Sequence, residues 1–365
     1  MKRLLGLFIV ATLLSAPGCE SNPSDAIGTG ISGAIDTVED WFGGGDLPSE
    51  HLEELRALHQ TGSWKLRPEI EGGLESAREA VRALGQADYS TWRDAGIVTQ
   101  VVSSIAFDHT ASLMRVEALD TLARIAPWTI AADQPPELVA SEGDVIDALK
   151  IVREAQGKRD TDPLLTAQVL HAVRVLGAYD FDGGARPKGD VPLRIAARRY
   201  GNKLRNARGV LLAFTGSTLE GFRADPEISA AMDRAYVSLS GAVIRATFIA
   251  SLMGDKKPTV RATAIRHASA LQLKGSGAEL RRSLQQDLSS SVRRAAAAAL
   301  GSYPEDVAVL ALIEGLYDDM PEVRGTASRA LTAATGETFG DDRGAWRRWW
   351  ETRKKSTADA SSASE

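Results

Sequence analysis

The stretches DLSSSVRRAAAAAL at 287–300 and DDMPEVRGTASRAL at 318–331 carry one pattern, repeated after 31 residues. Asp, Val, Arg, Ala and Leu occupy matching places in both stretches. The apolar residues of each stretch recur at the spacing of one face of an α-helix. A helical unit repeated at a fixed interval indicates a stacked array rather than a single globule. The sequence therefore predicts an all-α fold, an α-solenoid of antiparallel helix pairs.

Each repeat is expected to contain two helices joined by a short turn. In the clearest repeat the first helix is predicted over 305–316 and the second over about 322–334. Pro304 suits the entrance of the first helix, and Gly336 suits the end of the second. A lone helix pair cannot cover its apolar faces, so each repeat needs its neighbours.

The most specific part of the repeat is an Asp followed six residues later by an Arg. The pairs are Asp255 and Arg261, Asp287 and Arg293, and Asp318 and Arg324. An Asp in the turn can cap the second helix and accept a hydrogen bond from an Arg, including one of the adjoining repeat. We interpret the pairs as a structural ladder, because catalytic pairs would require the same chemistry in every repeat. A fourth, less regular copy contains Met114 and Arg115, with Asp108 as its acid.

The V-R-x-x-A second helix, the Asp turn and the repeat length resemble the HEAT-repeat family, specifically its short bacterial units. The resemblance is strong over 255–336 and weaker over 90–180, and residues 180–253 depart from it. It implies a curved α-solenoid that contacts other proteins. HEAT-like arrays also occur in chromophore lyases, so a small-molecule enzyme is one alternative. A purely structural spacer is another.

The first residues have the pattern of an export signal. Lys2 and Arg3 precede an apolar run over 4–14, and small residues follow at 16–18. The apolar run is shorter than the roughly 20 residues that a membrane-spanning helix needs. We therefore expect residues 1–18 to be a signal peptide.

Cys19, the only cysteine of the chain, directly follows the expected cleavage site. This placement resembles the lipobox of bacterial lipoproteins, although Ala16 and Pro17 depart from its usual residues. Cleavage by an ordinary signal peptidase is the alternative. We expect lipid on Cys19, and with it a protein anchored to a membrane of the cell envelope, on the periplasmic side.

The composition narrows the class of partner. The chain has 43 basic and 48 acidic side chains, and this mild acidity argues against a general nucleic-acid binder. We expect protein partners and no nucleic acid. With a single cysteine, stability must come from core burial, for which 44% hydrophobic residues suffice.

The sharpest charge feature lies at 191–219, which contains six basic side chains and no acidic one. Two readings are open: attraction to an acidic partner or an anionic surface, or a solvated face over a core that includes Leu204 and Leu211. The candidate partner-binding residues are Arg194, Arg198, Arg199, Lys203, Arg205 and Arg208.

Three aromatic residues, Trp346, Trp349 and Trp350, fall on one face of a predicted helix. The last repeat of a solenoid needs a cap over its apolar face, which this helix would supply. An aromatic ligand cage is the alternative. Beyond this helix, Ser, Ala and Thr predominate and predict disorder.

The sequence contains few motifs that would indicate catalysis or metal binding. The five histidines are scattered, and no nucleophile elbow, phosphate loop or paired-cysteine motif is present. Asp180 and Asp182 resemble the opening of a calcium loop. However, Gly184 stands at the third ligand position and Val191 stands where the loop needs its closing Glu. We expect no catalytic residues, no metal site and no cofactor.

These patterns divide the chain into successive sections. A helical stretch over 226–253 has Gly241 as a point of division into two helices. The sections are signal peptide 1–18, lipid anchor and tether 19–48, N-terminal helical repeats 49–178, irregular section with the basic stretch 179–253, regular repeats 254–336, Trp-rich capping helix 337–355 and disordered tail 356–365.

Overall fold

The computed structural model describes residues 73–86, 92–130, 140–159, 162–179, 193–215, 217–273 and 276–362. Within these ranges the chain forms helices and no β-strand. The helices are α5 (Gly73–Leu84), α6 (Trp92–Asp108), α7 (Ser112–Ile130), α8 (Glu142–Glu154), α9 (Pro163–Ala178), α10 (Leu193–Thr215), the 3-10 helix η3 (Ser217–Phe222), α11 (Pro226–Gly254), α12 (Pro258–Ala270), α13 (Ser276–Gln286), α14 (Ser290–Leu300), α15 (Glu305–Gly315), α16 (Pro321–Thr335) and α17 (Arg343–Ser362).

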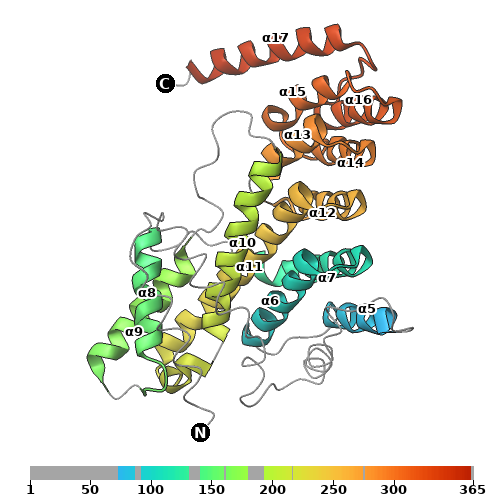
Figure 1. Ribbon diagram of the computed structural model, residues 1–365. Coiled ribbons are helices and arrows are strands. Elements are labelled where there is room, and N and C mark those ends of the chain that lie inside the picture. The colour runs from blue at the N-terminus through green and yellow to red at the C-terminus, as the bar shows by residue number, and fades with distance from the viewer. Residues whose placement is uncertain are drawn as a thin grey trace, which may run out of the picture.

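Two columns of helices build the solenoid (Figure 1). One column consists of α5, α7, α12, α14 and α16, and the other of α6, the C-terminal half of α11, α13 and α15. The successive repeats are therefore α6–α7, α11–α12, α13–α14 and α15–α16. This arrangement confirms the predicted α-solenoid.

The repeat pattern determines both the packing and the limits of the helices. The Val and Ala positions of the pattern are buried in every regular repeat: Val260, Ala264, Val292, Ala296, Val323 and Ala327. A side chain at Gly315 would place its Cβ 3.1 Å from that of Ala327, so α15 and α16 pack closely. Gly336 ends α16 with φ of 79°, a conformation that favours glycine. The helices α15 and α16 end within one residue of the predicted limits.

A second core lies beside the solenoid. It is formed by α8, α9, α10, η3 and the N-terminal half of α11, which together we call the insert. The helix α9 approaches α11 closely, because a Cβ at Gly177 would lie 2.9 Å from that of Ala235. The assignment of α8 and α9 to the N-terminal repeats was wrong. Their apolar faces pack against each other, α10 and α11 instead of extending the two columns.

Helix α11 joins the insert to the solenoid. Its first half contributes Tyr236 to the insert core, and its second half contributes Phe248 to the solenoid core. It runs unbroken through the buried Gly241, so the suggested division there was wrong. The helix is long and apolar enough to cross a membrane by length and composition, but 83% of its apolar window is buried inside the protein. That burial is typical of a core helix.

The solenoid ends in α17, which lies against α15 (Figure 1). This helix continues to Ser362, so the predicted start of a disordered tail at 356 was wrong. Lys and Ala are compatible with a helix, and a helix already anchored by its Trp residues extends at little cost.

Candidate functional site

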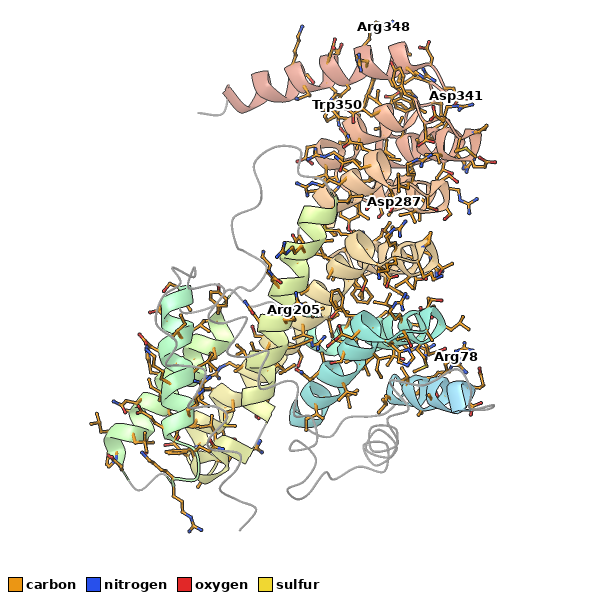
Figure 2. The ribbon with its side chains drawn as sticks, in the orientation of Figure 1. Arg78, Arg205, Asp287, Asp341, Arg348 and Trp350 are labelled. Carbon is orange, nitrogen blue, oxygen red and sulfur yellow. The ribbon has the colours of Figure 1, made fainter. Side chains whose placement is uncertain are left out.

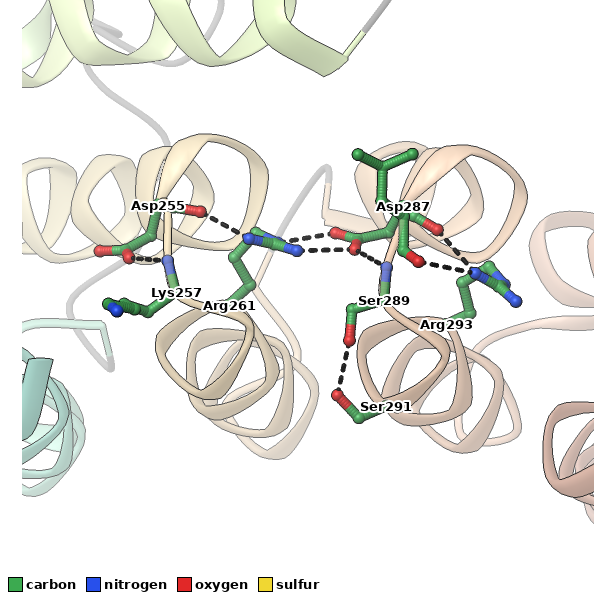
Figure 3. Close-up of polar contacts among 8 residues, drawn as sticks. Asp255, Lys257, Arg261, Asp287, Ser289, Ser291 and Arg293 are labelled. Atoms are coloured by element: carbon green, nitrogen blue, oxygen red, sulfur yellow. Dashed lines mark hydrogen bonds and ion pairs between the residues drawn. The ribbon is translucent and has the colours of Figure 1, made fainter. Parts of the chain in front are cut away.

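The Asp–Arg pairs form a ladder that links neighbouring repeats (Figure 3). Arg261 donates from Nε and Nη2 to the two carboxylate oxygens of Asp287, both at 2.7 Å. Arg293 does the same to Asp318, at 2.6 and 2.9 Å. Each Arg thus pairs with the Asp of the following repeat, in the bidentate geometry that gives the strongest hydrogen bonds.

Within its own repeat, each Arg binds the Asp main chain. Nη1 of Arg293 donates to the Asp287 carbonyl at 2.9 Å. The Asp287 carboxylate also accepts the Ser289 amide at 2.8 Å, which holds the turn before α14 (Figure 3). The Asp therefore fixes the turn and the Arg fixes the spacing between repeats.

The ladder also links the two repeats that the insert separates in the sequence. Arg115 on α7 donates to both carboxylate oxygens of Asp255 at 2.7 and 3.0 Å, although the two residues lie 140 positions apart. His109 takes the Asp place in the repeat of Arg115: its Nδ1 accepts the Ala111 amide, and its carbonyl accepts Nη1 of Arg115. The expectation that Asp108 is the acid of this repeat was therefore wrong.

Burial and pairing act together on the ladder charges. Burial by itself raises the pKa of the Asp318 carboxyl. Hydrogen bonds from Arg293 and the Met320 amide, with the charges of Arg293 and Arg324, outweigh burial and leave that pKa below its usual value. The hydrogen bond to Asp318 likewise raises the pKa of Arg293. Both groups stay charged near neutral pH, as structural ion pairs require.

The ladder runs along the turns between the two helices of each repeat, residues 109–113, 255–259, 287–291 and 317–322, which we call the turn edge. Several large apolar side chains stand exposed on it: Leu113, Leu288, Tyr317 and Met320. Leu288 is 98% exposed and Tyr317 53%. Repeat periodicity did not single out these residues, since Leu288, Tyr317 and Met320 lie in turns and Leu113 lies in the first turn of α7. For Leu288 and Tyr317 the available signal was an apolar residue directly beside the ladder Asp.

A groove of about 470 Å³ opens on the turn edge between the last two repeats. Leu288 and Tyr317 line it, together with the exposed acids Glu314 and Asp319. Gln285 donates a hydrogen bond to Glu314. The guanidinium of Arg343 lies 4.0 Å from the centre of the Tyr317 ring. The groove therefore offers apolar contact beside negative charge.

The basic stretch on α10 does not form a single surface. Arg208 is 3% exposed and donates to Asp108 on α6 at 3.2 Å, which ties the insert to the solenoid. Burial lowers the pKa of Arg208, against the opposing effect of Asp108. Its assignment to a partner-binding surface was wrong, because its side chain lies between helices.

The other basic residues of α10 differ in environment. Arg205 is exposed and donates to Asn202, and Arg198 is also exposed. Lys203 lies 5.1 Å from the centre of the Tyr200 ring. The side chains of Arg194 and Arg199 fall outside the described part. Figure 2 shows Arg205 on α10, away from Asp287 on the turn edge.

The Trp residues lie where α17 meets the last repeat. Trp346 is fully buried and donates from Nε1 to the Gly340 carbonyl at 2.9 Å. Phe339 meets it edge-on at 4.9 Å between ring centres. Trp350, labelled on α17 in Figure 2, is buried too, and Trp349 is partly buried. These positions are those of a cap over the solenoid core.

Two remaining expectations concern lipid on Cys19 and the binding of a metal ion. Cys19 lies outside the described residues, as does the loop with Asp180 and Asp182. Among the residues that are described, no three His, Cys, Asp or Glu side chains gather as a metal-ion site would require.

The fold and the ladder define the class, an α-solenoid built of helical repeats. Residues 245–336 match a family model described as HEAT repeats, which supports the HEAT-repeat family for this chain. The matched segment begins within α11 and ends at the glycine that closes α16. No curated protein matches the chain. HEAT repeats are helical scaffolds that often mediate protein interactions.

Proposed function

We propose that the protein is a non-enzymatic scaffold that binds another protein through the turn edge. The observation that carries the proposal is the exposure of Leu288 and Tyr317 at a groove between two repeats. Exposed apolar side chains gathered in one place mark interaction surfaces more often than chance. Burial of a side chain such as Leu288 on binding contributes about 1.5–3 kcal/mol.

The groove also indicates the chemistry of the partner. Glu314 and Asp319 are exposed acids beside the apolar side chains. A segment with apolar residues next to Lys or Arg complements both features. The ladder supports such a surface, because its bidentate pairs hold neighbouring turns at a fixed spacing and lower the cost of ordering on binding.

The ladder charges favour a scaffold over an enzyme. The carboxylates of Asp287 and Asp318 are each engaged by an Arg and by a main-chain amide. The pairing holds Asp318 in its charged form, whereas a general acid or base needs a pKa near the working pH.

Export and lipid anchoring complete the proposal. They are supported by the signal-like residues 1–18 and the sole cysteine at position 19. Cys19→Ser should convert a membrane-bound protein into a soluble one or block its processing. If the variant partitions into detergent as the wild type does, the protein is not anchored through Cys19.

Site-specific photocrosslinking in intact cells tests the scaffold role. A photoreactive amino acid is placed at Leu288, at Tyr317 or, as a control, at Leu164, which is 68% exposed on α9 of the insert. The turn-edge positions should both capture the same protein, and position 164 should not. Equal capture at all three positions, or none at 288 and 317, would overturn the proposed surface. If no position captures a protein, the surface is likewise overturned and the result fits a structural spacer.

A further inference from the structure

The last Arg of the ladder is oriented like the others. Nη1 of Arg324 donates to the carbonyls of Asp318 and Asp319 at 2.8 and 3.0 Å. The equivalent bond from Arg261 to the Asp255 carbonyl is 2.7 Å, and that from Arg293 to the Asp287 carbonyl is 2.9 Å. The main chain of its own repeat therefore holds each guanidinium in the same way.

In the described part of the chain, Arg324 lacks the carboxylate partner that the other ladder arginines have. Arg115, Arg261 and Arg293 each direct Nε and Nη2 at the Asp of the following repeat. After α16 the chain turns into α17 instead of a further repeat, and Asp342 there accepts the Ala345 amide at 2.9 Å. Among the described residues, no carboxylate pairs with Arg324.

We propose that Arg324 is a binding site for the carboxylate of an Asp or Glu side chain from a protein partner. Three copies of the same arrangement within this chain bind a carboxylate in bidentate fashion, so the geometry at Arg324 is already suited to one. A guanidinium that is held in advance loses less freedom on binding than a mobile surface Arg does.

A second copy stacked head to tail does not supply this carboxylate. Head-to-tail stacking would bring the first ladder position of another copy to Arg324, and that position holds His109 rather than Asp. The helix α5 also packs on α7 at this end of the solenoid, where its Arg82 binds Glu117. The ladder geometry therefore favours a different protein over a head-to-tail second copy as the source of the carboxylate.

A second cation, Arg343, also favours the binding of an acidic side chain beside Arg324. Arg343, at the start of α17, lies over the ring of Tyr317, which immediately precedes Asp318. Arg324 and Arg343 thus flank the last turn of the ladder. The site borders the groove at Asp319, whose carbonyl accepts Arg324 Nη1, but it is tested by carboxylate binding rather than by capture at Leu288 and Tyr317, so failure of one test leaves the other intact.

Arginine side-chain NMR tests the site on the full-length protein labelled with ¹⁵N-arginine. Acetate, which carries only the carboxylate of an acidic side chain, is titrated at constant ionic strength, with inorganic phosphate in a parallel series. Arg294, exposed on α14, is the matched control, and Arg324→Lys assigns the signal.

The Nε–H signal of Arg324 should shift at an acetate concentration about tenfold lower than that of Arg294, because two charge-assisted bonds form on a guanidinium that is already oriented. The signal of Arg293, paired with Asp318, should stay in place. Equal responses of Arg324 and Arg294 would overturn the proposal. A stronger response of Arg324 to phosphate than to acetate would also overturn it.

Discussion

Replacement of Arg293 by Met should destabilise the C-terminal repeats. The variant loses two hydrogen bonds to the Asp318 carboxylate, at 2.6 and 2.9 Å, and one to the Asp287 carbonyl at 2.9 Å. The Asp318 side chain is 7% exposed, so in the variant its charge remains nearly buried with the Met320 amide, but no cation, as its partner. Hydrogen bonds to charged groups contribute about 1.5–3 kcal/mol, and solvent reaches the partly exposed Arg, so we expect a loss of about 2–4 kcal/mol.

Arg324→Met is the matched control, because Arg324 makes the carbonyl bonds but pairs with no described carboxylate. Its loss should be about 1 kcal/mol or less. Urea denaturation followed by circular dichroism and by Trp fluorescence gives the free energies, provided that the two curves coincide. A double-mutant cycle of Arg293→Met with Asp318→Asn should show coupling of about 1.5–3 kcal/mol. Coupling indistinguishable from zero, or equal losses at the two arginines, would refute the role of the ladder.

Three further predictions follow from burial and charge. The folded pKa of Asp318 is lowered, so its stabilisation is complete above the unfolded pKa of about 3.9 and is lost as the pH falls through the folded value. Denaturation midpoints measured down to about pH 3 should therefore fall less steeply in Asp318→Asn than in the wild type. Trp346→Ala should cost about 3–5 kcal/mol in urea denaturation, because the side chain is fully buried. Arg208→Ala should lower the melting temperature through a loss of about 1–3 kcal/mol, whereas Arg205→Ala should change stability by less than about 0.5 kcal/mol.

The regular repeats were predictable because their information is local. The interval of 31 residues and the Asp–Arg spacing of six both lie within short segments. They predicted the helix pairs, the turns and the contact between neighbouring repeats. The pair Arg115–Asp255 was not predictable in the same way, because the insert places 140 positions between its members. Because the insert interrupts the regular spacing, the spacing does not show which repeats are neighbours on the two sides of the insert.

Two wrong predictions, Arg208 as a surface residue and Asp108 as the acid of its repeat, came from attention to charge alone. Arg208 lies four residues after Leu204 and three before Leu211, on the same helical face as these buried residues. Helical spacing therefore predicted burial, whereas the run of positive charges suggested a surface. His109 shares with Asp an acceptor atom that reaches the amide two residues later, although it is not a carboxylate. A search for acids alone therefore missed its place in the repeat.

The central claim is that the turn edge between the last two repeats binds a protein. Hydrogen–deuterium exchange of the complex with the purified crosslinked partner tests it most directly. The account predicts slower exchange in residues 284–291 and 314–322, which border the groove, and unchanged exchange in α9 around Leu164. Protection confined to α8 and α9, with the two turn segments unchanged, would contradict it.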